Sequence, residues 1–280
     1  MFPVIDEHEV IQLSIIFLGI QVIQTTLESL ANHRIYRKDQ LLSWDLLRYA
    51  KPFFHSNIWI TKALDVLFRY PTVLLLFVLR LLFAGGMVFL SWKGIESRLL
   101  TILILGTSGL GILLGWRNIF SNNGSDQLTT IILIPVCIYT TFAADPLVRI
   151  MSIYFIACQS ELSYLTSGFF KLAHKNWRNG NTLKEVLSTS VWGNRCVKSR
   201  LDKHPMLYKY GSYAVIGGEI LLGCSFIFPP YICICLLAAG VLFHLMVAIV
   251  MGLNTFFWAF LSTYSAVYYV CLIHHQAAAI

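Results

Sequence analysis

Long runs of apolar residues follow one another along most of the chain, separated by polar stretches. A membrane-spanning helix needs about 20 predominantly apolar residues. The pattern therefore predicts an all-α, polytopic transmembrane helix bundle with six to eight spans. The candidate spans are residues 10–30, 72–92, 99–118, 128–144, 147–173, 210–228, 231–253 and 255–273. The first is the most polar, so a buried or interfacial helix is the alternative there, and the fourth is short.

Asp145 and Pro146 separate the fourth apolar segment from the fifth. Proline fits the first turn of a helix, where its missing N–H is not needed. Aspartate is a preferred residue immediately before that turn, because its carboxylate accepts hydrogen bonds from the first N–H groups. The pair therefore predicts a helix boundary, with a new helix beginning at Pro146.

Residues without large apolar side chains, most of them polar, recur at helical spacing along the fifth segment. They are Tyr154, Glu161, Tyr164, Gly168, Lys171 and Lys175, at steps of seven, three, four, three and four. Such steps place residues on one face of an α-helix. Hydrocarbon offers no water to a charge, so an ionisable residue in a spanning helix usually faces the bundle interior and indicates a functional site.

The composition agrees with a membrane protein. Of the 280 residues, 57% are hydrophobic and only 12% are charged, which is about half the charged fraction of ordinary soluble domains. We expect a single integral membrane domain over residues 1–280.

Two stretches, residues 31–71 and 174–209, carry most of the positive charge behind the net charge of +7. They contain seven and eight Lys and Arg residues, and the positive-inside rule assigns both to the cytoplasmic face. Both stretches are predicted to form interfacial amphipathic helices anchored to membrane lipids, and residues 40–70 show the alternation of aromatic residues and cations that suits the headgroup boundary. A partner-docking surface is the alternative. No nucleic-acid-binding motif accompanies the cations, so nucleic acid is not an expected partner.

Ionisable residues also lie inside the apolar segments: Arg80, Glu161, Lys171, Glu219 and His244. Glu161 and Lys171 are ten residues apart, about 15 Å along a helix, so each needs a partner from another helix. Arg80 is the predicted counter-ion of Glu161 or Glu219, because its depth in the membrane is similar. Such a pair is either structural or catalytic.

Lys171 has two interpretations. Near a membrane face its ammonium can extend to the surface, whereas in dry surroundings the amine can lose its proton and act as a base or nucleophile. His244 could orient this amine or exchange a proton with it. No catalytic-triad order, zinc motif, P-loop or dinucleotide fingerprint occurs. The seven cysteines lack metal-ligand spacing, so no metal site is predicted.

Two stretches together resemble the signature of a membrane-protein family. Residues 164–172 read YLTSGFFKL and are followed by Trp177 and Gly180. This is similar to the Y-x-x-(A/S)-G/x-x-x-K-(L/F)…W-x-x-G pattern of the HTTM family, which is related to the membrane domain of vitamin K-dependent gamma-carboxylase. Residues 124–135, GSDQLTTIILIP, resemble the G-x-D-Q…L-x-P stretch of its bacterial, SdpB-type branch. With the helix that carries His244, the resemblance covers roughly residues 70–260.

The resemblance implies a multi-pass protein of the bacterial cell (plasma) membrane that helps to mature a secreted antimicrobial peptide. Its implied partners are the peptide toxin precursor and a small companion maturation protein. In the carboxylase, the lysine matched by Lys171 takes part in deprotonation fuelled by a reduced quinone, so that cofactor is implied only if this chain is carboxylase-like. Trp177 and Gly180 match as structural supports. The large propeptide-binding domain of the carboxylase has no counterpart in these 280 residues, which argues against glutamate carboxylation itself.

Our leading hypothesis is a membrane protein that binds a peptide precursor and modifies or processes it at a polar intramembrane site. The predicted catalytic residues are Lys171, His244 and Glu161. The predicted substrate-binding residues are Tyr164, Trp177, Asp126, Gln127, Arg80 and Glu219. The alternatives are a non-catalytic exporter, channel or immunity protein for the peptide, and a quinone-driven, carboxylase-like enzyme.

Overall fold

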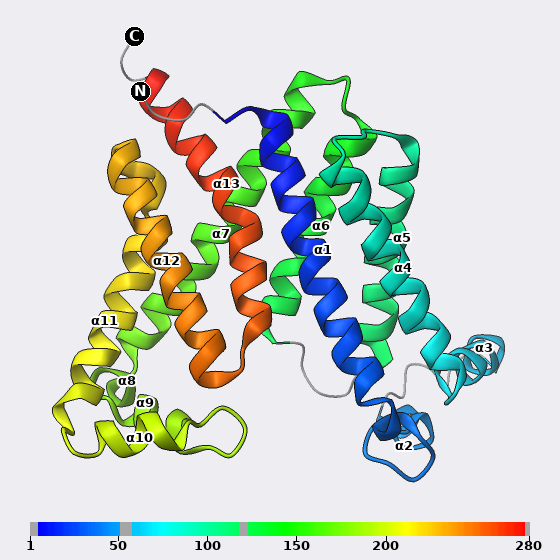
Figure 1. Ribbon diagram of the computed structural model, residues 1–280, viewed down its shortest axis with the longest axis horizontal. Coiled ribbons are helices and arrows are strands. Elements are labelled where there is room, and N and C mark those ends of the chain that lie inside the picture. The colour runs from blue at the N-terminus through cyan, green and yellow to red at the C-terminus, as the bar shows by residue number, and fades with distance from the viewer. Residues whose placement is uncertain (1–4, 51–57, 118–122, 278–280) are drawn as a thin grey trace. The chain divides into compact units, whose positions relative to one another are not determined.

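A computed structural model describes residues 5–50, 58–117 and 123–277, and within these ranges it contains thirteen α-helices, three short 3-10 helices and no strand (Figure 1). The predicted all-α class is confirmed. Residues 15–144 form one compact unit, here the N-terminal unit, and residues 1–14 with 145–280 form a second, the C-terminal unit. Each unit is described by itself, and a single membrane domain stays a prediction.

Long helices occupy all eight predicted apolar segments. They are α1 (Glu7–Ala31), α4 (Thr72–Trp92), α5 (Arg98–Arg117), α6 (Gly124–Thr141), α7 (Pro146–Ala173), α11 (Met206–Leu222), α12 (Pro230–Met251) and α13 (Asn254–Ala277). Five of these, α1, α4, α5, α12 and α13, are long and apolar enough to cross a membrane. The chain is therefore a helical membrane protein by composition and helix length. A count of six to eight spans also needs one or more of α6, α7 and α11, and stays a prediction.

The boundary predicted at Asp145 and Pro146 is confirmed. Asp145 is the N-terminal cap of α7, and its Oδ1 accepts hydrogen bonds from the backbone N–H groups of Leu147 (2.9 Å) and Val148 (3.3 Å). Pro146 occupies the first helical position, where no N–H is required. Because this signal is local, it could be read without knowledge of the tertiary structure.

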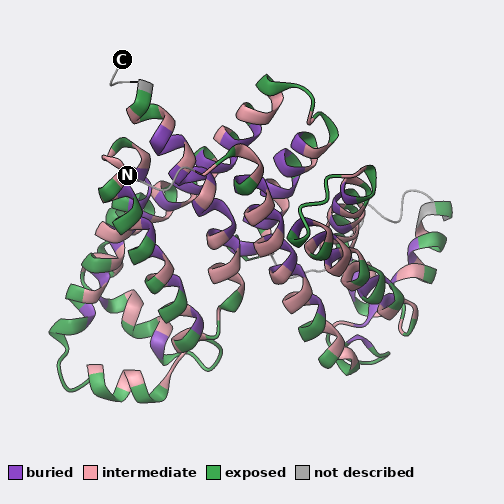
Figure 2. Ribbon diagram, turned by 45° about the horizontal axis from the view of Figure 1, so that its top comes forward, coloured by how far each residue is buried: buried purple, intermediate pink, exposed green. Residues whose placement is uncertain are grey.

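In the C-terminal unit, α7 packs against both α11 and α13, and α12 packs against α13. The first turns of α1 belong to this unit: Ser14 Oγ donates to the backbone oxygen of Ser262 (2.7 Å), and Arg149 Nε lies 2.8 Å from Glu7 Oε2. These neighbours bury one face of α7, and Figure 2 colours the helices by burial. The buried residues of α7 are Ser152, Ile153, Ile156, Ala157, Ser160, Glu161, Tyr164 and Gly168.

In the N-terminal unit, α5 packs against both α4 and α6. The part of α1 in this unit approaches α4 closely, because a Cβ added to Gly19 would lie 2.2 Å from Val88 Cγ2. Gln21, one of the polar residues of the first segment, is buried and hydrogen-bonded to α6: Thr129 Oγ1 donates to its Oε1, and its Nε2 donates to the backbone oxygen of Ser125. The polar side chain of Gln21 is therefore hydrogen-bonded inside the N-terminal unit.

The basic stretch 31–71 forms a small helical cap on the N-terminal unit, apart from residues 51–57, which lie outside the described residues. Its elements are η1 (His33–Tyr36), α2 (Trp44–Leu47), η2 (Arg48–Ala50) and α3 (Ile58–Phe68). Their inner faces share a hydrophobic cluster with α4 and α5, made of Tyr36, Trp44, Leu47, Leu64, Phe68, Val73, Leu76, Phe77 and Leu114. The second basic stretch forms α8 (Lys175–Arg178), α9 (Asn181–Ser188) and α10 (Arg195–Leu201). Both stretches are therefore helical, as predicted, and their position at a membrane interface stays a prediction.

Arg117, the last residue of α5, is 1% exposed and joins the cap to the bundle. Its Nε donates to the backbone oxygen of Phe68 (3.3 Å), one terminal nitrogen donates to that of Leu42, and its guanidinium lies 4.7 Å from the ring centroid of Tyr36. A cation at these positions satisfies carbonyl groups that the ends of the short elements leave without partners.

Arg117→Met is expected to destabilise the protein by about 2 kcal/mol, because a buried carbonyl that loses its donor costs roughly 1–3 kcal/mol. The measurement is thermal unfolding of the purified protein in detergent. Arg98→Met is the matched control, since Arg98 is exposed at the first residue of the same helix. Equal melting temperatures for the two variants would show that the hydrogen bonds of Arg117 contribute nothing.

Candidate functional site

The predicted polar stripe lies on the buried face of α7. Glu161, Tyr164 and Gly168 are buried, and the side chain of Lys171 is 14% exposed. Tyr154 is half-buried. Lys175 lies past the end of α7, is the first residue of α8 and is exposed, so it does not belong to the buried face.

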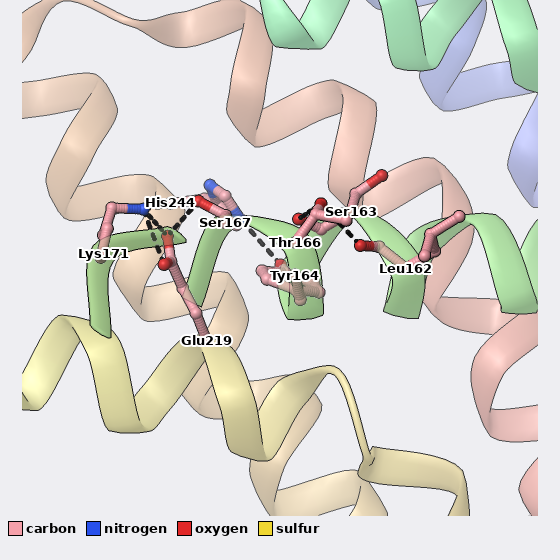
Figure 3. Close-up of polar contacts among 8 residues, drawn as sticks. All are labelled: Leu162, Ser163, Tyr164, Thr166, Ser167, Lys171, Glu219 and His244. Atoms are coloured by element: carbon pink, nitrogen blue, oxygen red, sulfur yellow. Dashed lines mark hydrogen bonds and ion pairs between the residues drawn. The ribbon is translucent and has the colours of Figure 1, made fainter. Parts of the chain in front are cut away.

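Lys171 forms an ion pair with Glu219 of α11 (Figure 3). Its Nζ lies 2.6 Å from both carboxylate oxygens, and the Glu219 side chain is 8% exposed. Of the two interpretations of Lys171, these contacts do not favour extension of the ammonium to a membrane surface, because the ammonium is held inside the unit. The prediction that Lys171 needs a partner from another helix is confirmed. The predicted counter-ion of Glu219, Arg80, is replaced in this role by Lys171.

Ser167 completes this ion-pair network. Lys171 Nζ donates to Ser167 Oγ one turn earlier on α7, and Ser167 Oγ donates to Glu219 Oε1 at 3.2 Å. Helices α7 and α11 approach closely at this level, because a Cβ added to Gly168 would lie 2.8 Å from Ile220 Cγ1 and 3.3 Å from Glu219 Cβ. The glycine in the family-like motif is thus explained by helix packing.

Trp177 and Gly180 support the network from the following turn of the chain. Lys171 Nζ lies 5.3 Å from the ring centroid of Trp177, within the range of a cation–π contact. Gly180 has φ of +82°, and a Cβ there would lie 2.5 Å from the backbone carbon of Tyr208. Tyr208 in turn donates to Asp202 (2.9 Å), and hydrogen bonds from Lys198 and Tyr208 lower the pKa of this exposed carboxyl. The predicted supporting role of both motif residues agrees with these contacts.

A second network joins α7 to α12 and α13. The Tyr164 hydroxyl lies 2.7 Å from His244 Nε2 and 2.6 Å from the Tyr264 hydroxyl. The His244 ring stacks on Phe260, with centroids 4.4 Å apart. Gly240, one turn before His244, provides the room, since a Cβ there would lie 2.4 Å from the Tyr264 hydroxyl. The partner of His244 is therefore Tyr164, and not Lys171 as the sequence suggested.

His244 Nδ1 is buried and has no hydrogen-bond partner among the described residues. In an imidazolium both ring nitrogens are donors, so a charged ring would leave a buried N–H without an acceptor. This favours a neutral ring whose Nε2–H donates to Tyr164, which then donates to Tyr264. Such a chain of hydroxyl and imidazole groups can pass a proton between α12, α7 and α13.

Glu161 belongs to a third network, and it lies three residues, or nearly one helical turn, further from Lys171 than Tyr164 does. Its Oε1 accepts hydrogen bonds from Ser225 Oγ (2.9 Å) and from the backbone N–H of Phe226 (3.0 Å), both in η4 (Ser225–Ile227). Its Oε2 is buried without a partner among the described residues. Glu161 is thus held by donors without charge, and Arg80 is not its hydrogen-bond partner. The predicted catalytic residues Lys171, His244 and Glu161 therefore lie in three separate networks, each of which includes a residue of α7.

The remaining predicted residues, Arg80, Asp126 and Gln127, belong to the N-terminal unit. Arg80 on α4 has a buried Nε without a hydrogen-bond partner among the described residues, and its charge lies within electrostatic range of Asp126. Asp126 and Gln127 lie in the first turn of α6, where Asn123 Oδ1 caps the helix by accepting from the Asp126 N–H (3.0 Å). The predicted site residues therefore divide between the two units: these three belong to the N-terminal unit, and all the others belong to the C-terminal unit.

The Lys171–Glu219 pair can hold its proton in two ways. As ammonium and carboxylate it consists of two buried charges, whose desolvation is costly. If the proton passes to Glu219, both groups become neutral and Lys171 presents a free amine, which is the form that acts as a base or nucleophile. Among the described residues no three His, Cys, Asp or Glu side chains gather as metal ligands.

Sequence reasoning missed Ser167, Ser225 and Tyr264 as members of these networks. Ser167 lies within the family-like motif, one turn before Lys171, so its spacing was a usable signal. Ser225 and Tyr264 gave no such signal, since serine is common at helix ends and α13 contains several tyrosines.

Comparisons with known proteins give no match: no family model, no curated protein and no solved structure matches this chain. Fold and site together define a helical membrane protein with a lysine–carboxylate pair and a tyrosine–histidine–tyrosine chain buried in one unit. The likeness of residues 124–135 and 164–180 to the HTTM signature stays a prediction.

Proposed function

We propose that this chain is a multi-pass protein of the bacterial plasma membrane that converts the precursor of a secreted antimicrobial peptide to its mature form. In this proposal Lys171 is the base or nucleophile of the reaction, and Glu219 is the group that stores its proton. The peptide precursor and a small companion maturation protein are the partners. A reduced quinone enters only in a carboxylase-like version of the reaction.

The observation that supports the chemical part is the buried contact of Lys171 Nζ with both Glu219 oxygens at 2.6 Å. Ser167 fixes the position of the amine, and the Trp177 ring covers it. An amine held this way has a defined direction and an acceptor for its proton, which are the requirements for a general base.

The peptide substrate is supported by the sequence alone. The stretch 164–180 resembles the HTTM signature, and three of its residues, Ser167, Gly168 and Trp177, contact or shape the surroundings of Lys171. The stretch 124–135 resembles the SdpB-type branch. The assignment to the plasma membrane follows from the same resemblance.

The test is to express the gene with its neighbouring peptide-precursor gene and to weigh the secreted peptide by mass spectrometry. Lys171→Ala is expected to abolish the mature mass, because no other amine replaces it in the network. Lys175→Ala is the matched control, since Lys175 is exposed outside the ion pair, and it should secrete mature peptide normally. The protein content of the membrane fraction is measured for both. Fully mature peptide from a Lys171→Ala strain would exclude a catalytic lysine.

A second candidate is a non-catalytic exporter, channel or immunity protein. It is favoured by the spacing of the three polar networks, since Glu161, Tyr164 and Lys171 extend over ten residues, or about 15 Å along α7. Polar groups at successive depths suit a pathway through a membrane. In that case Lys171→Ala would leave processing intact and trap mature peptide inside the cell. A mass increase on glutamate in the peptide would instead indicate quinone-driven carboxylation.

A further inference from the structure

Helix α3 presents a mixed cationic and apolar face that the N-terminal unit does not cover. Trp59 and Val66 are 77% and 66% exposed, and Lys62 and Arg69 are exposed beside them. Trp59, Lys62 and Val66 follow each other at steps of three and four on α3, and Arg69, three residues further, comes directly after the last residue of the helix, so the four positions form one stripe. We propose that this stripe, here the α3 stripe, is a binding surface for the headgroups of anionic phospholipids.

The opposite side of α3 is fixed to the unit, so the α3 stripe has a defined direction. Leu64 and Phe68 are buried in the cluster shared with α4 and α5. Asp65, on the flank, accepts hydrogen bonds from Trp44 Nε1 (2.6 Å) and Arg48 (3.2 Å). Rotating α3 to bury Trp59 and Val66 would break these contacts.

The position of α3 in the chain brings the α3 stripe to the membrane surface. Helix α3 ends at Phe68, and α4, one of the five helices able to cross a membrane, begins at Thr72. A spanning helix enters the bilayer at the headgroup layer. Three intervening residues cannot carry α3 more than about 10 Å from that layer.

The chemistry of the α3 stripe selects a lipid surface over an acidic protein. Trp59 is of the residue type that collects at membrane interfaces, and Lys62 Nζ lies 5.6 Å from its ring. Val66 adds an apolar group between the two cations, which suits shallow insertion among acyl chains. Arg69 shares its charge with Asp45 at 3.2 Å, and both side chains stay about half exposed. Residues 31–71 carry seven Lys and Arg and three Asp, a net charge of +4.

The experiment titrates the full chain in detergent with phosphatidylglycerol and follows its melting temperature. Phosphatidylglycerol is expected to raise the melting temperature, whereas phosphatidylcholine and inorganic phosphate are not. Lys62→Ala/Arg69→Ala should weaken the apparent affinity for phosphatidylglycerol by about 30-fold, since each cation near an anionic surface contributes on the order of 5-fold.

Lys93→Ala/Arg98→Ala is the control for this titration. It removes two exposed cations at the opposite end of α4, with the same change in net charge, and should keep the affinity of the original chain. Equal affinities for the two double variants would overturn the proposal, and so would a rise in melting temperature with inorganic phosphate alone. Trp59→Phe gives a second readout, because it should remove part of the fluorescence quenching by lipids that carry a nitroxide near the headgroup. Unchanged quenching would contradict contact of the α3 stripe with lipid.

Discussion

Glu219→Gln is expected to destabilise the protein by about 3–5 kcal/mol, because removal of one partner from a buried ion pair leaves the other charge uncompensated. The Lys171 ammonium would lose two contacts of 2.6 Å and keep only Ser167 and the Trp177 ring. Thermal unfolding in detergent measures the loss. Asp45→Asn is the control, because its pair with Arg69 is about half exposed and should contribute at most about 1 kcal/mol.

Lys171→Met/Glu219→Gln is expected to recover most of the stability lost in Glu219→Gln, since the double variant buries no charge at this level. The double variant therefore separates the effect of the ion pair on stability from its effect on peptide maturation. A well-folded double variant that secretes no mature peptide supports the proposed role of Lys171. A well-folded double variant that matures the peptide normally would reduce the ion pair to a structural contact between α7 and α11. Failure of the double variant to regain stability would show that the pair is not the source of the loss.

The positions of the long helices could be predicted because the signal is local. Apolar length alone located eight segments, and Asp145 with Pro146 marked a helix start through capping chemistry that involves only adjacent residues. The buried face of α7 followed from the 3.6-residue period, which any helix obeys. The division into two units gave no signal of this kind, because apolar segments of equal length do not reveal which helices pack together.

The partners of the buried charges could not be predicted, because they depend on which helices meet. Lys171 and Glu219 are 48 residues apart, and Arg80 offered a charge of the right sign at a similar depth. Only the packing of α7 on α11 selects between these pairings. Gly168 carried a hint of that choice, since a glycine three residues before Lys171 permits another backbone to come close on the same face. The sequence shows that an approach is allowed without showing which helix makes it.

The family-like motif can be explained in large part by packing, and this changes how it is interpreted. Gly168 admits α11, Ser167 orients the amine, and Trp177 covers it. Only Lys171 in this group carries chemistry of its own. A motif of this kind therefore describes the surroundings that a buried lysine requires.

Gly180→Ala is expected to destabilise the C-terminal unit by about 3 kcal/mol. A residue with a Cβ at φ of +82° is strained by roughly 1–3 kcal/mol, and the added atom would also lie 2.5 Å from the Tyr208 backbone carbon and 2.6 Å from the Lys209 nitrogen. Because both are backbone atoms, relief requires a shift of the start of α9 relative to α11, and Trp177 lies one turn before this point. Thermal unfolding in detergent gives the loss, and reduced peptide maturation should accompany it.

Gly252→Ala isolates the backbone strain, because Gly252 also has a positive φ, +71°, but no atom lies within 4 Å of its added Cβ. That variant should lose only the conformational strain, about 1 kcal/mol, and should mature peptide normally. The difference between the two variants then measures the close approach of Gly180 to α11. Equal losses of stability in the two variants would mean that the contact of the new Cβ with Tyr208 is relieved without moving α9 relative to α11. The contact between Trp177 and Lys171 would then not depend on Gly180, and Gly180 would serve only the positive φ of the turn.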